Sequence, residues 1–161
     1  MTKRRHSLVG KTIIGAIRFG CDRTGAAVVE FAMLAPVLFM LLIGTFQFGI
    51  VINQYIQLTE ATRVGGRTLA ISRGTSTPIA TTKNAVYASA PSLTQGNMGF
   101  TIYAGATQCT TVENTCSTAL TNNQGGQATI TVSYNACSAF VFGKDYLPSC
   151  NLSSTTSVRI E

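Results

Sequence analysis

One carboxylate of this chain lies directly before a long uncharged stretch. Glu30 precedes an apolar run, residues 31–52, that contains no charged residue. A carboxylate at the edge of a membrane span is energetically costly, and such a group is usually functional. Gly25, which closes a cationic segment, lies five residues before Glu30. This junction predicts a signal for cleavage and assembly rather than a simple membrane anchor.

Four of the five cysteines follow the apolar run, an even number that suits disulfide pairing in an oxidising compartment. They are Cys109, Cys116, Cys137 and Cys150. Of the three possible pairings we favour Cys109–Cys116 with Cys137–Cys150, because each bond then closes a loop beside a strand. Each bond would contribute roughly 2.5 to 3 kcal/mol in the chain-entropy model. A zinc site formed by these cysteines is the alternative to disulfides. The sequence has no C-x-x-C, however, and its single histidine, His6, precedes the apolar run.

The remaining polar residues form no catalytic constellation. Because His6 lies before the apolar run, no Ser-His or Cys-His arrangement is expected in the part of the chain that follows it. The acids after the run are dispersed and have no paired-carboxylate spacing: Glu60, Glu113, Asp145 and Glu161. We therefore expect that the protein is not an enzyme and that it has no bound cofactor and no metal site.

The net charge of +6 is concentrated at one end of the chain. Six of the twelve basic residues come before Gly25, against the single acid Asp22. Lys and Arg that cluster before a span stay in the cytoplasm and send the following part across the membrane. The alternative, a solvated basic tail with a small affinity for nucleic acid, is disfavoured by this placement. The charge pattern therefore predicts an orientation and no nucleic-acid partner.

Residues 31–52 are long enough to cross a lipid bilayer. As a helix they would rise roughly 33 Å, close to the thickness of the hydrocarbon core. A cleavable secretory signal has a shorter apolar region that ends in small residues of the A-x-A type, and residues 44–49 offer no such site. Pro36 lies inside the run and predicts a kink or local unwinding.

Beyond the span, the hydrophobic pattern predicts a helix packed on a sheet. Apolar residues at helical spacing predict one helix from about Ala26 to about Ser72, with a weak point at Gly65 and Gly66. Period-two alternation predicts antiparallel strands, and a short helix precedes them. The expected segments are a helix at 79–89 and strands at 98–104, 128–134 and 158–161.

These elements define an α+β fold class. A long N-terminal helix, first transmembrane and then amphipathic, packs on a small antiparallel β-sheet domain and covers its apolar face. The expected organisation is a basic cytoplasmic leader that is cleaved (1–25), a transmembrane helix (26–53) and an exported helix-on-sheet domain with two disulfides (54–161).

The residues around the junction resemble those of a known family. The segment from Gly25 to Phe31, the following Ala-Met-Leu-Ala-Pro36 and the later Phe46-Gln-Phe-Gly49 are similar to the TadE-like pseudopilin family of tight-adherence (type IVc) pilus systems. Residues 58–67 resemble the small-residue and arginine stretch that follows the span in that family. The resemblance covers about residues 24–70, whereas the C-terminal domain agrees only in its size and its pilin-like, strand-rich pattern.

The resemblance implies cleavage by a membrane-embedded aspartyl prepilin peptidase on the cytoplasmic face. Gly25 would precede the cut, and Ala26 would become the new N-terminus. Glu30 and Phe31 would act in assembly and recognition, with Glu30 of one subunit neutralising the new amine of a neighbour. Burying either charge alone would cost several kcal/mol, so the pairing would set the register of assembly.

The major pilins of such systems are much shorter than this chain, so the resemblance implies a minor pseudopilin of pilus initiation or of a tip complex, and hence a role in adhesion and biofilm formation. The implied partners are the prepilin peptidase, other pilin and pseudopilin subunits, the inner-membrane pilus assembly platform and the lipid bilayer. The implied location is the bacterial inner membrane, crossed once, with the N-terminus cytoplasmic and the C-terminal domain periplasmic or incorporated in a surface pilus.

A second hypothesis belongs to a different class. The chain would be an uncleaved, single-pass, membrane-anchored periplasmic module for binding or adhesion, and the aromatic residues between Phe140 and Tyr146 would form its contact surface. The two hypotheses differ at the Gly25–Ala26 bond, which only the first requires to be cut.

Overall fold

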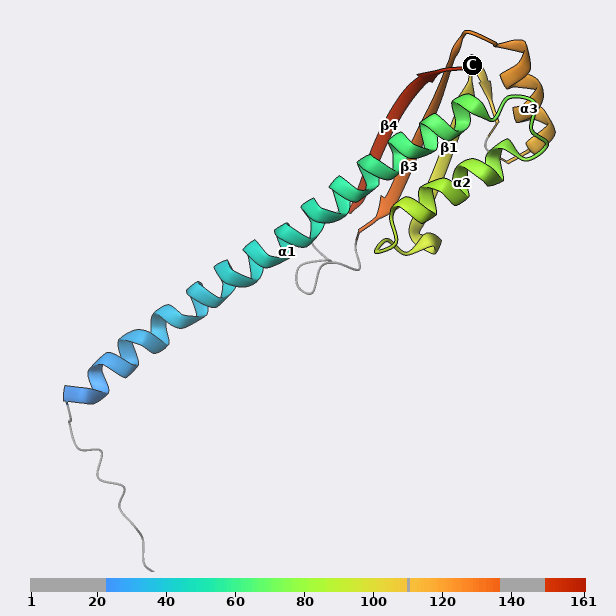
Figure 1. Cartoon of the computed structure of the whole chain (residues 1–161). Coiled ribbons are helices and arrows are strands. Elements are labelled where there is room, and N and C mark those ends of the chain that lie inside the picture. Colours follow the sequence, from blue (N-terminus) through green and yellow to red (C-terminus); the bar gives the residue numbers. More distant parts are fainter. Residues whose placement is uncertain (1–22, 110, 137–149) are drawn as a thin grey trace, which may run out of the picture. The chain divides into compact units, whose positions relative to one another are not determined.

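The computed structural model describes residues 23–109, 111–136 and 150–161 (Figure 1). These residues belong to two units that divide after Met40, the second of which begins at Leu41. Helix α1 (Arg23–Ile71) begins in the first unit and contains Pro36. Its most apolar 18-residue window has a mean hydropathy of 2.4, and none of that window is buried. Length and composition therefore allow this helix to cross a membrane.

In the second unit, α1 ends where the sequence predicts and a second helix follows. Gly74 adopts a φ of 79°, a left-handed conformation that glycine accepts without the steric cost of a Cβ. Helix α2 (Pro78–Ser89) then begins with Pro at its first position, where the missing N–H breaks no helical hydrogen bond. Both the end of α1 near Ser72 and the helix expected at 79–89 are confirmed.

A four-stranded antiparallel sheet completes the second unit, with the strand order β2-β1-β3-β4. A 3-10 turn (Gln95–Asn97) leads into β1, and helix α3 (Glu113–Asn122) lies between β2 and β3 in sequence. The α+β class is confirmed. The strands are β1 (Met98–Ala104), β2 (Thr107–Gln108), β3 (Gln127–Asn135) and β4 (Asn151–Arg159).

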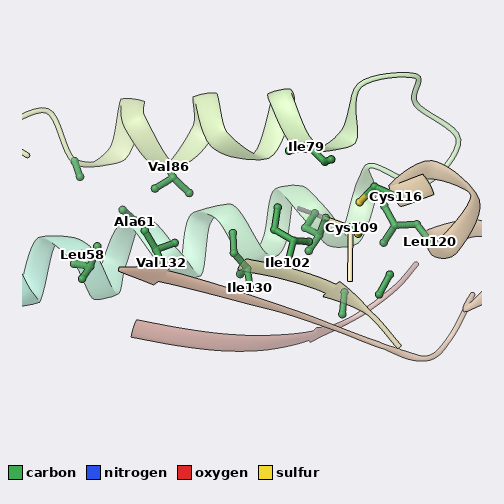
Figure 2. Packing of buried hydrophobic residues seen from close by; sticks show 14 of the residues in the cluster. Leu58, Ala61, Ile79, Val86, Ile102, Cys109, Cys116, Leu120, Ile130 and Val132 are labelled. Carbon is green, nitrogen blue, oxygen red and sulfur yellow. The ribbon is translucent and has the colours of Figure 1, made fainter. Parts of the chain in front are cut away.

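The two faces of the sheet differ in chemistry. Even-numbered residues such as Ile102, Ile130 and Val132 are fully buried and face the two helices α1 and α2 (Figure 2). Odd-numbered positions carry hydroxyls on the other face, where Thr131 Oγ1 lies 2.9 Å from Thr155 Oγ1 on the neighbouring strand. One face therefore builds the core, and the other is polar.

The structure corrects the expected C-terminal strand and adds two elements. Strand β4 begins at Asn151 rather than at Val158, and it ends at Arg159. Its inward-facing positions include the hydroxyl residues Ser154 and Thr156. The apolar alternation by which β1 and β3 could be predicted is therefore interrupted in β4. Strand β2 is too short for a period to appear, and α3 has only a narrow apolar side.

Gly65 and Gly66 mark the closest approach of α1 to the rest of the second unit. A Cβ on Gly65 would lie 2.5 Å from Val86 Cγ2 of α2 and 3.2 Å from Ile130 Cδ1 of β3. A Cβ on Gly66 would lie 3.1 Å from Thr156 Cγ2 of β4. The two glycines, weak helix formers by propensity, therefore let α1 pack between α2 and the sheet.

Candidate functional site

The residues of the predicted cleavage junction lie in the first turns of α1. The helix begins at Arg23, so the Gly25–Ala26 bond belongs to its first turn, and Glu30 follows Ala26 by one helical turn. Gly25, Ala26 and Glu30 are exposed, and Phe31 is 64% exposed. A Cβ placed on Gly25 would meet no atom within 4 Å. The structure therefore presents the junction on one continuous helix, without packed neighbours among the described residues.

The helix that follows Glu30 carries apolar side chains on all its sides. Met33, Leu34 and Phe46 are each more than three-fifths exposed, and their spacing in a helix of 3.6 residues per turn points them in three different directions around the axis. A helix that is hydrophobic all round is stable only inside a protein core or a membrane. This stretch can therefore insert into lipid or pack against other apolar helices.

The two cysteines of the predicted first disulfide meet in the second unit. Cys109 follows β2 and Cys116 lies in α3, and both are buried (Figure 2). Their side chains are hydrogen-bonded to each other. The structure has the pair as two thiols rather than as a bonded disulfide, so the predicted Cys109–Cys116 bond stays a prediction.

The contact between the two thiols shifts their pKa values in opposite directions. The hydrogen bond from Cys116 lowers the pKa of Cys109, and this effect outweighs the burial that opposes it. The pKa of Cys116 is raised because its proton is held by Cys109 and because the thiol is buried. The thiolate is the species that reacts in disulfide chemistry, so Cys109 is the thiol of the pair that forms it more readily, although both side chains are buried.

The second predicted disulfide is described at one end only. Cys150 is buried and disulfide-bonded, and its carbonyl oxygen accepts a hydrogen bond from the Ala136 N–H at 2.9 Å. Cys137, its predicted partner, lies outside the described residues, as do the aromatic residues from Phe140 to Tyr146. Their pairing and the aromatic surface remain predictions.

Glu113 has a structural role that its isolated place in the sequence did not indicate. Its carboxylate accepts hydrogen bonds from the Ile79 and Ala80 N–H groups, each at 2.8 Å. Ile79 and Ala80 lie in the first turn of α2, where backbone N–H groups have no partner within the helix. The first residue of α3 therefore caps α2 across more than 30 residues of sequence.

The described residues offer little for catalysis. A pocket of about 390 Å³ beside α3 is lined by Thr and Asn side chains with Ala119, and it contains no titratable group. Within residues 23–109, 111–136 and 150–161, no group of three or more His, Cys, Asp or Glu side chains is placed to hold a metal ion. The pocket can donate and accept hydrogen bonds but supplies no acid, base or nucleophile beyond hydroxyls.

Comparison with known proteins found no match among curated proteins and none among solved structures. A match to a protein family falls on the segment that begins at the junction and ends near the close approach of α1 at Gly65 and Gly66. Residues 25–67 match the family described as TadE-like protein, so this segment of the chain is similar to that family.

Proposed function

We propose that this protein is a minor pseudopilin of a type IVc pilus, cut by a prepilin peptidase and acting in the initiation or the tip complex of the pilus. The observation that carries the proposal is the junction itself, Gly25 to Phe31, at the start of a helix with an uncharged apolar run. The TadE-like match at residues 25–67 supports involvement in a tight-adherence pilus and a structural rather than enzymatic role.

The position of the Gly25–Ala26 bond favours cleavage. A protease needs its substrate backbone to be locally opened, and the cost of opening is lowest at a helix end. The first backbone N–H groups of α1 have no partner within the helix, so unwinding this turn breaks few hydrogen bonds. Gly25 lowers the cost further, since glycine is about 1 kcal/mol less favourable than alanine in a helix.

Cutting this bond would change the charge of the chain directly before its apolar run. The cationic leader would be removed, and a single new amine would appear at Ala26. An amine or a carboxylate alone in apolar surroundings is strongly disfavoured, so each needs an opposite charge. Glu30 of a neighbouring subunit would supply that charge for Ala26, which would fix the axial register between two subunits.

The rest of the chain would act in the periplasm. The basic leader favours a cytoplasmic N-terminus, and the helix that follows would cross the inner membrane once. The prepilin peptidase, the assembly platform and other pilin subunits would meet this helix in the bilayer. The domain after the helix would then be carried to the surface of the membrane or into the pilus.

One experiment distinguishes the processed subunit from an uncleaved membrane anchor. The full chain is co-expressed with a matching prepilin peptidase, and the N-terminus of the product is sequenced. We expect a chain that starts at Ala26, and a Gly25→Leu variant in the same cells should remain uncut. A wild-type product that still starts at Met1 or Thr2 would refute the processing step and favour the membrane-anchored module.

A further inference from the structure

Strand β4 forms an open edge of the sheet. It pairs along its whole length with β3, from Asn151 opposite Asn135 to Arg159 opposite Gln127. Among the described residues no strand pairs with its other side, because β4 is last in the order β2-β1-β3-β4. Alternate N–H and C=O groups of such an edge point outward and can accept another strand.

Native proteins usually protect an open edge, and most of β4 carries none of the side chains that give this protection. Lysine, proline and β-bulges are the common devices that prevent pairing. The eight residues from Asn151 to Val158 include no charged residue and no proline, and all nine residues of β4, which ends with Arg159, pair with β3 without a bulge. The edge is therefore long and chemically suited to a further strand.

A groove of about 470 Å³ lies where the end of β4 meets the last turns of α1. Its apolar floor includes Ile71, which is 66% exposed although it is a large hydrophobic residue. Exposed apolar side chains of this kind beside a polar rim are typical of protein-binding surfaces. The lining consists of Arg67, Ala70, Ile71, Val158, Arg159 and Glu161.

The charges around the groove favour an acidic occupant. Arg67 and Arg159 are both exposed, and within the described part of the chain neither forms an ion pair. Glu161 is the one acid in the lining, and its backbone oxygen accepts a hydrogen bond from Nε of Arg73, a third arginine nearby. Guanidinium groups bind carboxylates through two parallel hydrogen bonds, so they select planar acidic side chains.

Within the described residues, a second copy of this chain does not provide such an occupant. The described acids are Glu30 and Glu60 in α1, Glu113 at the start of α3 and Glu161 itself. Glu60 is paired with Arg63 at 2.9 Å, and Glu113 is held by the cap of α2. Glu161 lies just beyond β4, but antiparallel pairing of two β4 strands would place it at the end of the strand that is far from Arg159. The described acids of a second copy therefore do not reach the two arginines, and the proposed acidic strand belongs to a different protein.

We propose that the β4 edge, with the groove between Arg67 and Arg159, binds an extended acidic segment of a partner protein as a fifth strand. The backbone of that segment pairs with β4, its apolar side chains cover Ile71, and its carboxylates contact the two arginines. This is the recognition mode in which main-chain hydrogen bonds provide affinity and side chains provide selectivity. It does not depend on cleavage at Gly25, since every group involved lies in the second unit.

The test uses the full chain in detergent micelles and a fluorescein-labelled peptide of eight residues in which pairs of valines alternate with pairs of aspartates. Both faces of the added strand then carry apolar side chains and carboxylates, which the contacts with Arg67 of α1 and with Arg159 on the opposite face require. Binding is followed by fluorescence anisotropy at low salt. We expect the aspartate peptide to bind at least tenfold more tightly than the same peptide with lysine in place of aspartate. A third peptide, methylated at alternate backbone nitrogens, should lose binding because it cannot pair with β4.

Two substitutions connect the binding to the groove. Arg67→Gln and Arg159→Gln should each weaken the aspartate peptide about tenfold, since each removes one charge-assisted contact worth about 1.4 kcal/mol. Arg63→Gln is the matched control on the same helix and should leave binding unchanged, because Arg63 is engaged by Glu60.

Three outcomes would overturn the proposal. These are equal binding of the aspartate and lysine peptides, unchanged binding of the methylated peptide, and equal affinities of Arg159→Gln and the wild type. Light scattering on the same samples reports whether two copies of the chain associate. If the chain forms a dimer that the peptide dissociates, the strand that binds β4 belongs to a second copy and not to a partner protein. The processing of Gly25 is measured separately, so either result can stand when the other fails.

Discussion

Glu30 is the residue on which the proposed assembly depends. It is exposed in the first turns of α1, and the next charged residue along the chain is Glu60. We expect Glu30→Ala to be processed normally or slightly less, whereas its incorporation into pili should fail because the new amine of a neighbour loses its partner. Immunoblots of sheared pili and of membranes measure the two steps.

Glu30→Gln provides the control for shape, since it keeps the size of the side chain and removes the charge. It should assemble as poorly as Glu30→Ala. Normal piliation of either variant would remove the Glu30 charge from the assembly step.

Glu113 is a residue whose importance comes from two backbone contacts. Glu113→Ala leaves the Ile79 and Ala80 N–H groups without their acceptor. We expect the free energy of unfolding of the domain to fall by about 1 to 3 kcal/mol, the range for lost caps and charge-assisted hydrogen bonds. Urea unfolding of the full chain in micelles, followed by near-ultraviolet circular dichroism, measures the change.

The matched control is Glu60→Ala, which removes another helical carboxylate. Glu60 pairs with Arg63 on the surface, where the side chains are about three-fifths exposed, so the loss should stay below about 1 kcal/mol. Equal losses in the two variants would contradict the capping role.

Cys109 and Cys116 supply a prediction about pH. In the reduced, folded protein, the hydrogen bond from Cys116 lowers the pKa of Cys109, so its thiolate forms at lower pH than that of an ordinary cysteine, whose pKa is about 8.5. Glutathione disulfide should therefore close the Cys109–Cys116 bond at lower pH than it would with an ordinary cysteine, and the two thiol protons pass to the two glutathione thiols that are released. Mass spectrometry of the alkylated protein follows the product.

Cys116→Ala tests the cause of this shift. Removing the hydrogen-bond donor leaves only burial, which raises the pKa of Cys109, so the midpoint of its alkylation rate against pH should move upward. The same midpoint in the variant and in a reduced wild-type sample would show that Cys116 does not control the thiolate.

At the scale of elements, α1 changes its surroundings along its length. Its first part exposes large apolar side chains such as Phe31 and Met40, whereas Leu58, Ala61 and Leu69 are fully buried in the core of the second unit. Between these buried residues, Gly65 and Gly66 remove the side chains that would separate the helix from α2 and β4. One helix therefore serves first as an apolar stem and then as a layer of the domain.

Gly65→Ala tests this packing. The new Cβ would lie 2.5 Å from Val86 Cγ2, a distance at which the neighbour has to move. Overpacking costs about 1 to 3 kcal/mol, and alanine returns about 1 kcal/mol of helix propensity, so we expect a net loss of up to about 2 kcal/mol in urea unfolding. Gly49→Ala, where no atom lies within 4 Å, should not destabilise the domain.

A double-mutant cycle separates the contact from a general effect on the helix. In Gly65→Ala with Val86→Ala, the methyl group that the new Cβ meets is gone. The combined loss should be smaller than the sum of the two single losses. Strict additivity would mean that the Gly65–Val86 approach does not limit the packing of α1.

At the scale of the whole molecule, charge asymmetry predicts the orientation in the membrane. Half of the basic residues precede Gly25, ahead of a helix that is long and apolar enough to cross a bilayer. We expect alkaline phosphatase fused after Glu161 to be active, because that enzyme needs the disulfides of an oxidising compartment. A β-galactosidase fusion at the same place is the control and should be inactive, and the reverse pattern would contradict the orientation.

The sequence by itself determined those features of the protein that depend on residues close together along the chain. The junction from Gly25 to Phe31, the apolar run and the ends of α1 and α2 could be predicted because each is written in consecutive residues or in a helical period. Strands β1 and β3 were predictable for the same reason, since their inward positions are apolar at every second residue. The TadE-like match falls within this locally determined part.

Only the tertiary structure decided the contacts between distant residues. Glu113 caps the first turn of α2, and Gly65 and Gly66 face α2 and the sheet, through chain folding that no local period records. Strand β4 was predicted only from Val158 onward because Ser154 and Thr156 occupy inward positions, so the place of its first part beside β3 rests on backbone pairing rather than on apolar side chains. The open edge of β4 and its arginine-lined groove exist for the same reason, because an edge is a property of the sheet and not of the strand.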